Sequence, residues 1–275
     1  MRLDRPIGIY LVLWPTLWAL WLAAEGVPHW HELLIFVLGT VVMRSAGCVI
    51  NDYADRDIDG HVSRTVNRPL ANNEVSPQFA LYLFGGLLLL ALGLVSLTNT
   101  TTVVTALGAV ALTVVYPFMK RHTYLPQIVL GAAFAWAIPM AFAAVTETLP
   151  KAMWTLYIAV LIWTVIYDTF YAMVDREDDL KIGVKSTAIL FAENDRLITA
   201  SLQAFTLIIF LTVGVSFNLQ WPFYLSLMTT AGLFGYQQFL IRQRNPARCF
   251  EAFLNNNWVG MVLFIGIVLS YAVGG

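Results

Sequence analysis

Acidic residues interrupt an otherwise apolar sequence at two places, and in both places they recur at every fourth position. The first acidic set consists of Asp55 and Asp59 together with the amide Asn51 four positions earlier, and the second consists of Asp175 and Asp179. Residues four apart lie on one face of a helix, so each set presents its oxygen atoms as a stripe. If the stripes face one cavity, each carboxylate pair at roughly 4 Å repels by about 4 kcal/mol at an effective dielectric constant of about 20. A divalent cation would remove that repulsion, so these five residues are the predicted metal ligands.

The donor atoms of these stripes indicate which metal they would bind. The chain has only four His and two Cys residues, and hard carboxylate oxygens favour Mg²⁺ or Mn²⁺. Mg²⁺ typically takes one or two carboxylates together with phosphate oxygens of a substrate. A calcium-binding EF-hand is the alternative, because residues 55–60 read Asp-Arg-Asp-Ile-Asp-Gly, but Val66 stands where the loop needs a glutamate. We therefore expect Mg²⁺ and a phosphorylated substrate.

Basic residues lie close to both acidic sets, and two of the three basic pairs again have a spacing of four. They are Arg64 with Arg68, Lys181 with Lys185, and the adjacent residues Lys120 and Arg121. A metal ion surrounded by Arg and Lys side chains is typical of a diphosphate-binding site. The cations share the phosphate charge and stabilise a departing pyrophosphate. The alternative is that these residues only mark cytoplasmic loops, which are rich in Lys and Arg. We interpret all six as candidate substrate-binding residues.

Further polar residues lie beside the acidic stripes. Arg44 precedes Asn51 by seven positions on the same helical face, Tyr171 precedes Asp175 by four, and Asp168 is adjacent to the second stripe. Ionisable groups in a membrane span cost about 2.5–3.5 kcal/mol each on insertion scales, which makes them functional candidates. Asp52 and Asp57, by contrast, point away from the first stripe and are interpreted as ordinary loop charges.

The composition indicates how such residues are held in place. The 275 residues are 59% hydrophobic and 12% charged, with a mean hydropathy of +0.70, whereas ordinary globular domains are about 25% charged. Apolar stretches recur along the whole length, so we predict a single transmembrane domain over residues 1–275. The net charge is −1 and no basic tract occurs, so nucleic acid is not expected as a partner.

Nine apolar segments are long enough to cross a bilayer, for which a helix needs about 20 residues. They are 7–24, 33–51, 77–97, 102–118, 127–145, 152–173, 196–217, 222–241 and 254–273. The predicted fold is therefore all-α and polytopic. If the N-terminus is cytoplasmic, fifteen of the sixteen Lys and Arg residues fall on the cytoplasmic side, and only Lys151 does not. Both acidic sets then lie at cytoplasmic span ends, next to the long polar segments 52–76 and 174–195.

These motifs are similar to those of a known family. Asn51-Asp52-x-x-Asp55-x-x-x-Asp59, together with Asp175-x-x-x-Asp179, resembles the paired aspartate-rich signature of the UbiA superfamily of intramembrane prenyltransferases. The resemblance extends over nearly the whole chain. It includes the segments Leu13-Trp14-Pro15-Thr16, Tyr116-Pro117-Phe118-Met119-Lys120-Arg121, Ile138-Pro139-Met140-Ala141 and Ile182-Gly183-Val184-Lys185-Ser186-Thr187.

The resemblance implies a fold, an activity and a location. It implies nine helices around a central cavity that opens laterally to membrane lipid, in the inner membrane of a bacterium. It also implies Mg²⁺-dependent transfer of a polyprenyl group from polyprenyl diphosphate to C3 of 4-hydroxybenzoate in ubiquinone biosynthesis. The resemblance also implies that Asp55, Asp59, Asp175 and Asp179 are catalytic residues that bind metal and diphosphate, with Asn51 assisting. Arg44 resembles the position that meets the aromatic acid.

This chemistry is consistent with the residue pattern. Metal and cations draw charge onto the diphosphate, the allylic C–O bond ionises, and the cation forms in an apolar cavity that excludes water. Tyr167, Tyr171 and Trp136 are candidates to line the path of the cation through cation–π attraction. Asp168 is a candidate proton acceptor; orienting the arene and supporting the metal ligands are its alternative roles.

Two other functions remain open at this point. An ion transporter would also carry intramembrane carboxylates, but it would be expected to show broken helices at mid-membrane in both halves of the chain. A related enzyme with homogentisate, a naphthoate or haem as its acceptor would share the aspartates.

Overall fold

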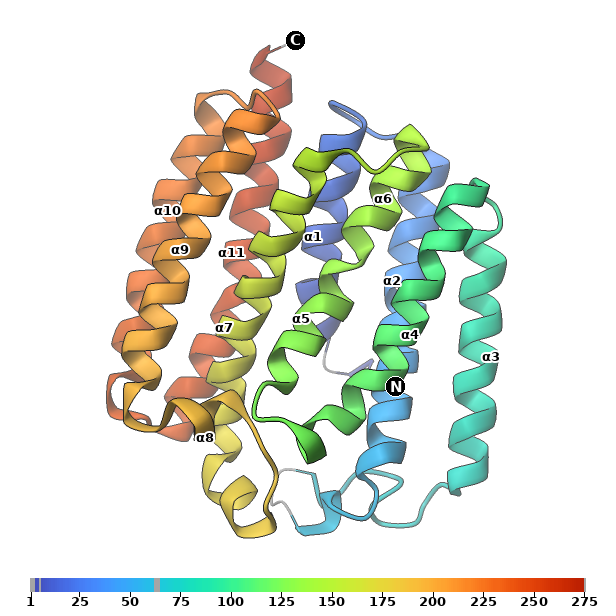
Figure 1. Cartoon of the computed structure of the whole chain (residues 1–275), viewed down its shortest axis with the longest axis vertical. Helices are drawn as coiled ribbons and strands as arrows, with labels where there is room; N and C mark the ends of the chain where they lie inside the picture. The colour runs from blue at the N-terminus through green and yellow to red at the C-terminus, as the bar shows by residue number, and fades with distance from the viewer. Residues whose placement is uncertain (1–2, 5, 62–64, 275) are drawn as a thin grey trace.

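The computed structural model describes residues 3–4, 6–61 and 65–274, and this part of the chain is helical and contains no strand. Most of the long helices lie side by side in one bundle (Figure 1). The predicted all-α class is confirmed. The helices are α1 (Ile7–Ala23), α2 (Trp30–Asp55), η1 (Asp59–His61), α3 (Pro77–Val95), α4 (Thr100–His122), α5 (Pro126–Ala135), α6 (Ala137–Thr146), α7 (Lys151–Ile182), α8 (Thr187–Phe191), η2 (Ala192–Asn194), α9 (Asp195–Ser216), α10 (Trp221–Leu240), η3 (Ile241–Gln243) and α11 (Pro246–Gly274).

Seven segments within the described residues are long and apolar enough to cross a membrane, so the chain has the character of a multi-pass membrane protein. They comprise α2, α3, α4, α5 with α6, α7, α8 with α9, and α11. The expected spans 7–24 and 222–241 are also helical, as α1 and α10, but these two helices are not among the seven. The number of nine spans therefore stays a prediction.

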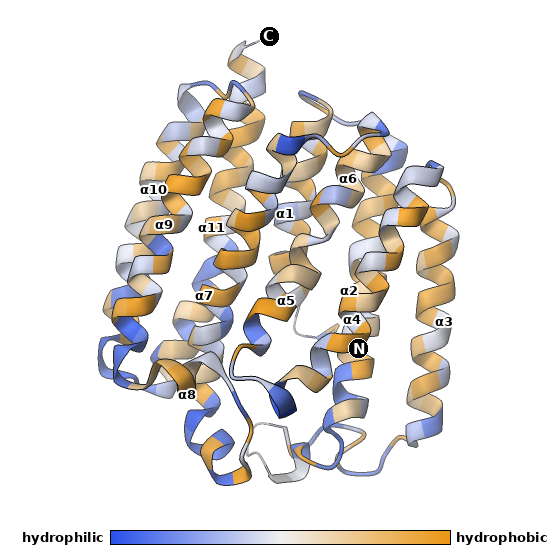
Figure 2. Ribbon diagram, in the orientation of Figure 1, coloured by the Kyte–Doolittle hydropathy of each residue, from blue (hydrophilic) through white to orange (hydrophobic). Residues whose placement is uncertain are grey.

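Two helices extend beyond the ends that hydropathy predicts. α2 continues from the expected end at 51 to Asp55, and α7 continues from 173 to Ile182. The polar segments 52–76 and 174–195 therefore begin inside helices. Backbone hydrogen bonds within a helix do not require apolar side chains, so a helix can leave the apolar region intact. Hydrophilic residues gather where α2 and α7 end (Figure 2), and we call this the acidic end of the bundle.

The expected span 127–145 is divided into two helices, α5 and α6, that meet at Trp136. The backbone N–H of Trp136 donates to Ala133 O at 3.3 Å, which is a tighter turn than an α-helix makes. Pro139, two residues into α6, has no N–H with which to continue the hydrogen bonds of α5. α5 and α6 can therefore follow different directions along α7 and α1.

α11 is joined to three helices by three consecutive asparagines. Trp14 of α1 donates its indole N–H to Asn257, Trp163 of α7 donates to Asn256, and an amide of α10 donates to Asn255, all at 2.8–2.9 Å. Successive helical residues point about 100° apart, so three neighbours can reach three different helices. Polar groups inside a membrane need partners within the protein, and these bonds hold the side of the bundle opposite α3 and α4 together.

Candidate active site

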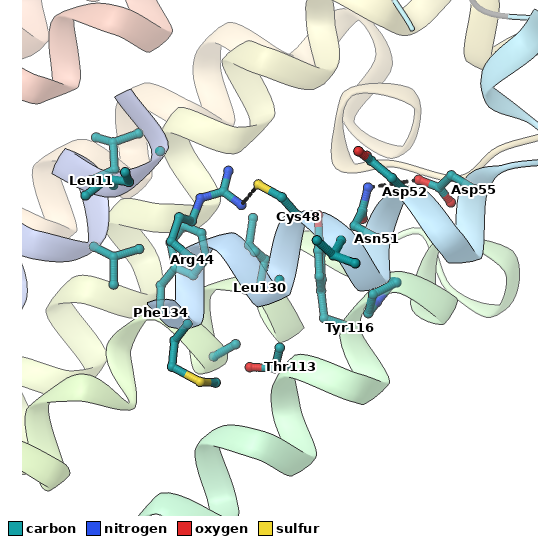
Figure 3. Close-up of a pocket in the computed structure, with 18 of the residues that line it drawn as sticks. Leu11, Arg44, Cys48, Asn51, Asp52, Asp55, Thr113, Tyr116, Leu130 and Phe134 are labelled. Atoms are coloured by element: carbon teal, nitrogen blue, oxygen red, sulfur yellow. Dashed lines mark hydrogen bonds between the residues drawn. The ribbon is translucent and has the colours of Figure 1, made fainter. Parts of the chain in front are cut away.

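A cavity of about 820 Å³ lies between α1, α2, α3, α4, α5 and α7, and both acidic sets line it. Figure 3 shows part of its wall, where polar side chains of α2 face Thr113 and Tyr116 of α4. The structure brings most of the predicted site residues to this cavity: Arg44, Asn51, Asp55, Asp59, Arg68, Lys120, Asp168, Tyr171, Asp175, Asp179 and Lys185. Residues more than 120 positions apart in the chain thus border one space.

Asp55 is the last residue of α2, and its side chain is almost fully buried. Its Oδ2 atom lies 2.6 Å from Lys120 Nζ and accepts a hydrogen bond from Asn51 Nδ2 at 3.1 Å. Within the described residues, Oδ1 is buried and has no hydrogen-bond partner. A buried carboxylate oxygen without a partner is costly, so Oδ1 has the character of an atom prepared for a ligand.

Asp59 reaches the cavity by a different route from the one that its spacing predicts. α2 ends at Asp55, and Asp59 begins the short helix η1, so the two residues do not share one continuous helical stripe. Arg68 Nη1 donates to Asp59 Oδ2 at 2.6 Å, and this bond fixes the position of the Asp59 side chain. Burial raises the pKa of the Asp59 carboxyl, while the Arg68 guanidinium opposes this effect and the neighbouring Asp55 adds to it.

Asp52 is also part of this cluster, although its position in the sequence was interpreted as loop charge. Its side chain lines the cavity, and its Oδ1 lies 3.2 Å from Arg68 Nη1. The interpretation is wrong because residues three apart on a helix are also neighbours, which places Asp52 beside Asp55. The i, i+3 spacing was the signal that could have identified it. Asp57 is exposed at the surface and pairs with Arg56.

The segment after α7 is attached to the end of α4. The backbone N–H of Lys185 donates to the carbonyl of Lys120 at 3.2 Å, which brings two of the predicted basic residues to the same edge of the cavity. Lys185 Nζ lies 5.4 Å from the centre of the Tyr124 ring and donates to a backbone carbonyl at 3.4 Å. Thr187 N donates to the buried side chain of Gln127, which fixes this segment against the start of α5.

Arg44 lies deeper in the cavity, on the same helix as Asn51 and Asp55. Seven residues separate it from Asn51, which is about 10 Å along a helix. Its Nη1 donates to Cys48 Sγ at 3.1 Å, and its guanidinium carbon lies 5.7 Å from the centre of the Phe134 ring (Figure 3). Its Nε atom is buried without a partner among the described residues. One cavity therefore has a cation at one end and carboxylates at the other.

The carboxylates fit a hard divalent cation, although they do not form a finished metal site by themselves. Among the described side chains, no three His, Cys, Asp or Glu residues converge closely enough to hold a metal ion. The donors around the cavity are carboxylate and amide oxygens, which suit Mg²⁺, and Asp55 Oδ1 is available. Mg²⁺ commonly completes its coordination with phosphate oxygens and water.

Residues 12–268 match the UbiA prenyltransferase family. This chain belongs to that family. It is 63% identical to the 4-hydroxybenzoate octaprenyltransferase of Saccharophagus degradans, over 98% of this chain and 90% of the relative. It is 59% identical to the enzyme of the same name from Nitrosococcus oceani, over 98% of this chain and 95% of the relative.

Solved structures share the UbiA fold. The apo structure of a UbiA homolog from Aeropyrum pernix K1 has a TM-score of 0.84 and 23% identity, over 98% of both chains. A UbiA homolog from Archaeoglobus fulgidus, solved bound to GPP and Mg²⁺, has a TM-score of 0.76 and 20% identity, over 99% of this chain and 98% of that chain. At these identities the likeness concerns the fold.

Not every residue singled out from the sequence lies at the cavity of this UbiA-family chain. Arg121 instead donates to the carbonyl of Ala54, one of the last carbonyls of α2 that lack a partner within their helix. Lys181 is exposed and pairs with Asp178 at 3.1 Å. Neither residue is among those that line the cavity, so their role in substrate binding stays a prediction. Arg64 lies outside the described residues.

Of the three aromatic residues singled out from the sequence, two line the cavity and one does not. Trp136 does not line the cavity, because its indole N–H donates to the carbonyl of Thr105 at 2.8 Å. Tyr167 and Tyr171 both line it. Tyr116 was not singled out, yet it lines the cavity from α4, one turn before Lys120 (Figure 3). The four-residue spacing from Lys120 was the signal for this residue.

Proposed function

We propose that this UbiA-family chain transfers a polyprenyl group from polyprenyl diphosphate to C3 of 4-hydroxybenzoate and releases pyrophosphate, as a step of ubiquinone biosynthesis. Curated relatives at 56–63% identity carry the name 4-hydroxybenzoate octaprenyltransferase. The observation that carries the proposal is that one cavity has the acidic and basic cluster at its end and Arg44 further inside. Such a cavity can hold a diphosphate and an aromatic carboxylate at the same time.

The proposed cofactor is Mg²⁺, held by Asn51, Asp55, Asp59, Asp175 and Asp179. The support is the oxygen donor set, the unpartnered Oδ1 of Asp55, and the UbiA homolog from Archaeoglobus fulgidus that was solved with GPP and Mg²⁺. When bound, Mg²⁺ neutralises charge on the diphosphate and makes it a better leaving group.

The side chains at the acidic end act on the diphosphate. Lys120, Arg68 and Lys185 border the cavity and carry positive charge to the oxygens on which negative charge accumulates as the allylic C–O bond breaks. The electron pair of that bond leaves with the diphosphate. The apolar wall from α3 and α4, which includes Leu88 and Val110, surrounds the prenyl chain and keeps water from the cation.

The side chains further inside act on the acceptor. Arg44 pairs with the carboxylate of 4-hydroxybenzoate and orients the ring, so that C3 faces the allylic carbon. The new C–C bond forms from ring electrons, and the proton on C3 then leaves to a base. Asp168 lines the cavity and is the proposed acceptor of that proton, while Tyr171 is proposed to contact the cation through its ring.

We further propose a single domain over residues 1–275 with nine spans, a cytoplasmic N-terminus and a cytoplasmic active site in a bacterial inner membrane. A helix or helix pair at each expected span supports the number. The Lys and Arg distribution supports the orientation. Membrane lipid surrounds the bundle, whose α3 and α4 carry exposed apolar side chains such as Leu89 and Leu107.

Product analysis tests this function against its alternatives. Purified protein with Mg²⁺ receives octaprenyl diphosphate, the donor for which the relatives are named, and an equimolar mixture of 4-hydroxybenzoate, homogentisate and a naphthoate. The expected product mass is that of prenylated 4-hydroxybenzoate, and pyrophosphate release requires both substrates. A product from another arene would assign a different acceptor. Pyrophosphate release or ion transport without any arene would refute the transferase proposal.

A further inference from the structure

Gly8 of α1 lies directly against the guanidinium of Arg44. A Cβ atom at position 8 would be 2.5 Å from both Nε and Nη2 of Arg44, and 2.9 Å from Cζ. Real Cβ atoms essentially never approach another heavy atom more closely than 3.0 Å. The guanidinium therefore occupies the space that the side chain of any other amino acid at position 8 would fill.

This contact sets the direction in which Arg44 presents its charge. The guanidinium is bordered by Gly8 of α1, by Cys48 of α2 and by the Phe134 ring of α5, and all four residues line the same cavity. Long arginine side chains have many rotamers, and a fixed direction must come from the atoms around them. Gly8 contributes by leaving room for one position of the guanidinium close to the backbone of α1.

The contact at Gly8 differs in kind from a close glycine contact that meets backbone atoms. A Cβ at Gly131 would meet the backbone carbonyl of Leu161 at 2.7 Å, and backbone atoms of a packed helix cannot move without cost. At Gly8 the obstacle is the far end of a flexible side chain. Alanine at position 8 would therefore displace the guanidinium and leave the helices in place.

We propose that Gly8 is a positioning residue that determines acceptor specificity through Arg44. The inference rests on the proposed function, because it concerns the carboxylate of the acceptor. An arginine fork pairs with a carboxylate through two parallel hydrogen bonds, and this pairing depends on direction as well as distance. Moving the Arg44 guanidinium should weaken the preference for an arene that carries a carboxylate. A binding site discriminates most strongly through the polar groups of a substrate with which it forms hydrogen bonds.

Steady-state kinetics of Gly8→Ala test the proposal. The KM for 4-hydroxybenzoate should rise about tenfold or more, because a 1 Å misplacement of a positioning group can cost up to about 100-fold. The KM for the prenyl diphosphate should stay within about twofold, because the diphosphate lies about two to three helical turns away. The preference for 4-hydroxybenzoate over its neutral analogue 4-hydroxybenzamide should fall with the same variant. Gly232→Ala is the matched control, because a Cβ at this glycine of α10 meets no atom within 4 Å.

A double-mutant cycle identifies the route of the effect. Arg44→Ala should raise the KM for 4-hydroxybenzoate, and adding Gly8→Ala to it should change the KM no further. Additive effects would overturn the proposal, since Gly8 would then act without Arg44. An unchanged KM for Gly8→Ala beside a raised KM for Arg44→Ala would also overturn it while leaving the proposed function intact. An unchanged KM for Arg44→Ala would remove both the Arg44 role and this inference.

Thermal unfolding keeps the test decisive if the single variant is unstable. Any instability that arises from contact with the guanidinium should disappear in Gly8→Ala combined with Arg44→Ala. If the double variant is as unstable as Gly8→Ala alone, the alanine meets something other than Arg44 and the proposal fails.

Discussion

Lys120 Nζ lies 2.6 Å from Asp55 Oδ2 and so links the end of α4 to the last residue of α2. Both side chains border the cavity, and Asp55 has a second oxygen that is buried without a partner among the described residues. Asp55 could therefore help to hold Mg²⁺ through Oδ1 while Oδ2 keeps the Lys120 ammonium at the same end of the cavity. In the proposed reaction that ammonium would share the charge of the diphosphate.

Lys120→Met tests that arrangement, because methionine keeps much of the length and removes the charge. Losing a hydrogen bond to a charged group costs about 1.5–3 kcal/mol, so kcat/KM for the prenyl diphosphate should fall roughly 10- to 150-fold. The KM for 4-hydroxybenzoate should change little. Arg242→Gln is the control, because its guanidinium lies over the Phe239 ring and away from the cavity. A kcat/KM within twofold of the original protein would argue against contact between Lys120 and the diphosphate.

Asp55→Asn and Asp175→Asn should each abolish most of the transfer activity. Both changes keep the size of the side chain and remove the charge that binds a hard cation, so we expect a loss of at least about 100-fold, comparable to losing a group that stabilises charge in a transition state. Pyrophosphate release measured over a range of Mg²⁺ concentrations reports the effect. Asp57→Asn is the matched control, since 73% of that side chain is exposed. Substantial residual activity in either variant would exclude a direct metal role for that residue.

The sequence was sufficient to predict that the segments with the acidic residues are helical, because this prediction depends only on residues close together in the chain. Hydropathy and the four-residue spacing are properties of neighbouring residues, so the all-helical class and the orientation of Asn51 relative to Asp55 follow from them. α2 and α7 continue past the predicted span ends at 51 and 173, because hydropathy falls where polar residues begin while the helical hydrogen bonds continue.

Contacts between distant segments were not predictable in this way. Arg68 joins Asp52 to Asp59 through a turn that follows α2, and neither the turn nor the pairing has a periodic signature. The contact of Gly8 with Arg44 depends on how closely α1 approaches α2, which packing decides. A glycine in an apolar segment can occur for many reasons, and only the structure shows that Gly8 lies against the guanidinium of Arg44.

Removing divalent cations should stop the reaction without unfolding the protein. Asp55 and Asp59 already have cationic partners within the chain, in Lys120 and Arg68, so chelation does not leave these two buried carboxylates without a counter-charge. We expect EDTA to abolish product formation and to change the melting temperature by no more than about 2 °C, which is less than about 1 kcal/mol for a chain of this size. Restoring Mg²⁺ should restore activity. A large drop in melting temperature with EDTA would show that the metal is structural.

An ion cluster around the fully buried Asp195 side chain fixes the end of α7 that carries the second acidic set. Asp195, the first residue of α9, accepts a hydrogen bond from Arg176 Nη2 at 2.5 Å and another from Arg244 Nε at 3.0 Å. Arg176 is the neighbour of Asp175 on α7. The cluster therefore joins the helix that holds the proposed metal ligands to α9 and to the turn before α11.

Asp195→Asn should weaken both the fold and the metal site. Removing the carboxylate charge weakens hydrogen bonds to two charged groups, each worth about 1.5–3 kcal/mol, which thermal unfolding would register as a clearly lower melting temperature. The Mg²⁺ concentration for half-maximal activity should rise as well, because the end of α7 is less firmly held. Glu251→Gln, which breaks the exposed pair with Arg248, should change neither quantity appreciably. If Asp195→Asn lowered the melting temperature and left the Mg²⁺ dependence unchanged, the cluster would stabilise the fold without positioning Asp175.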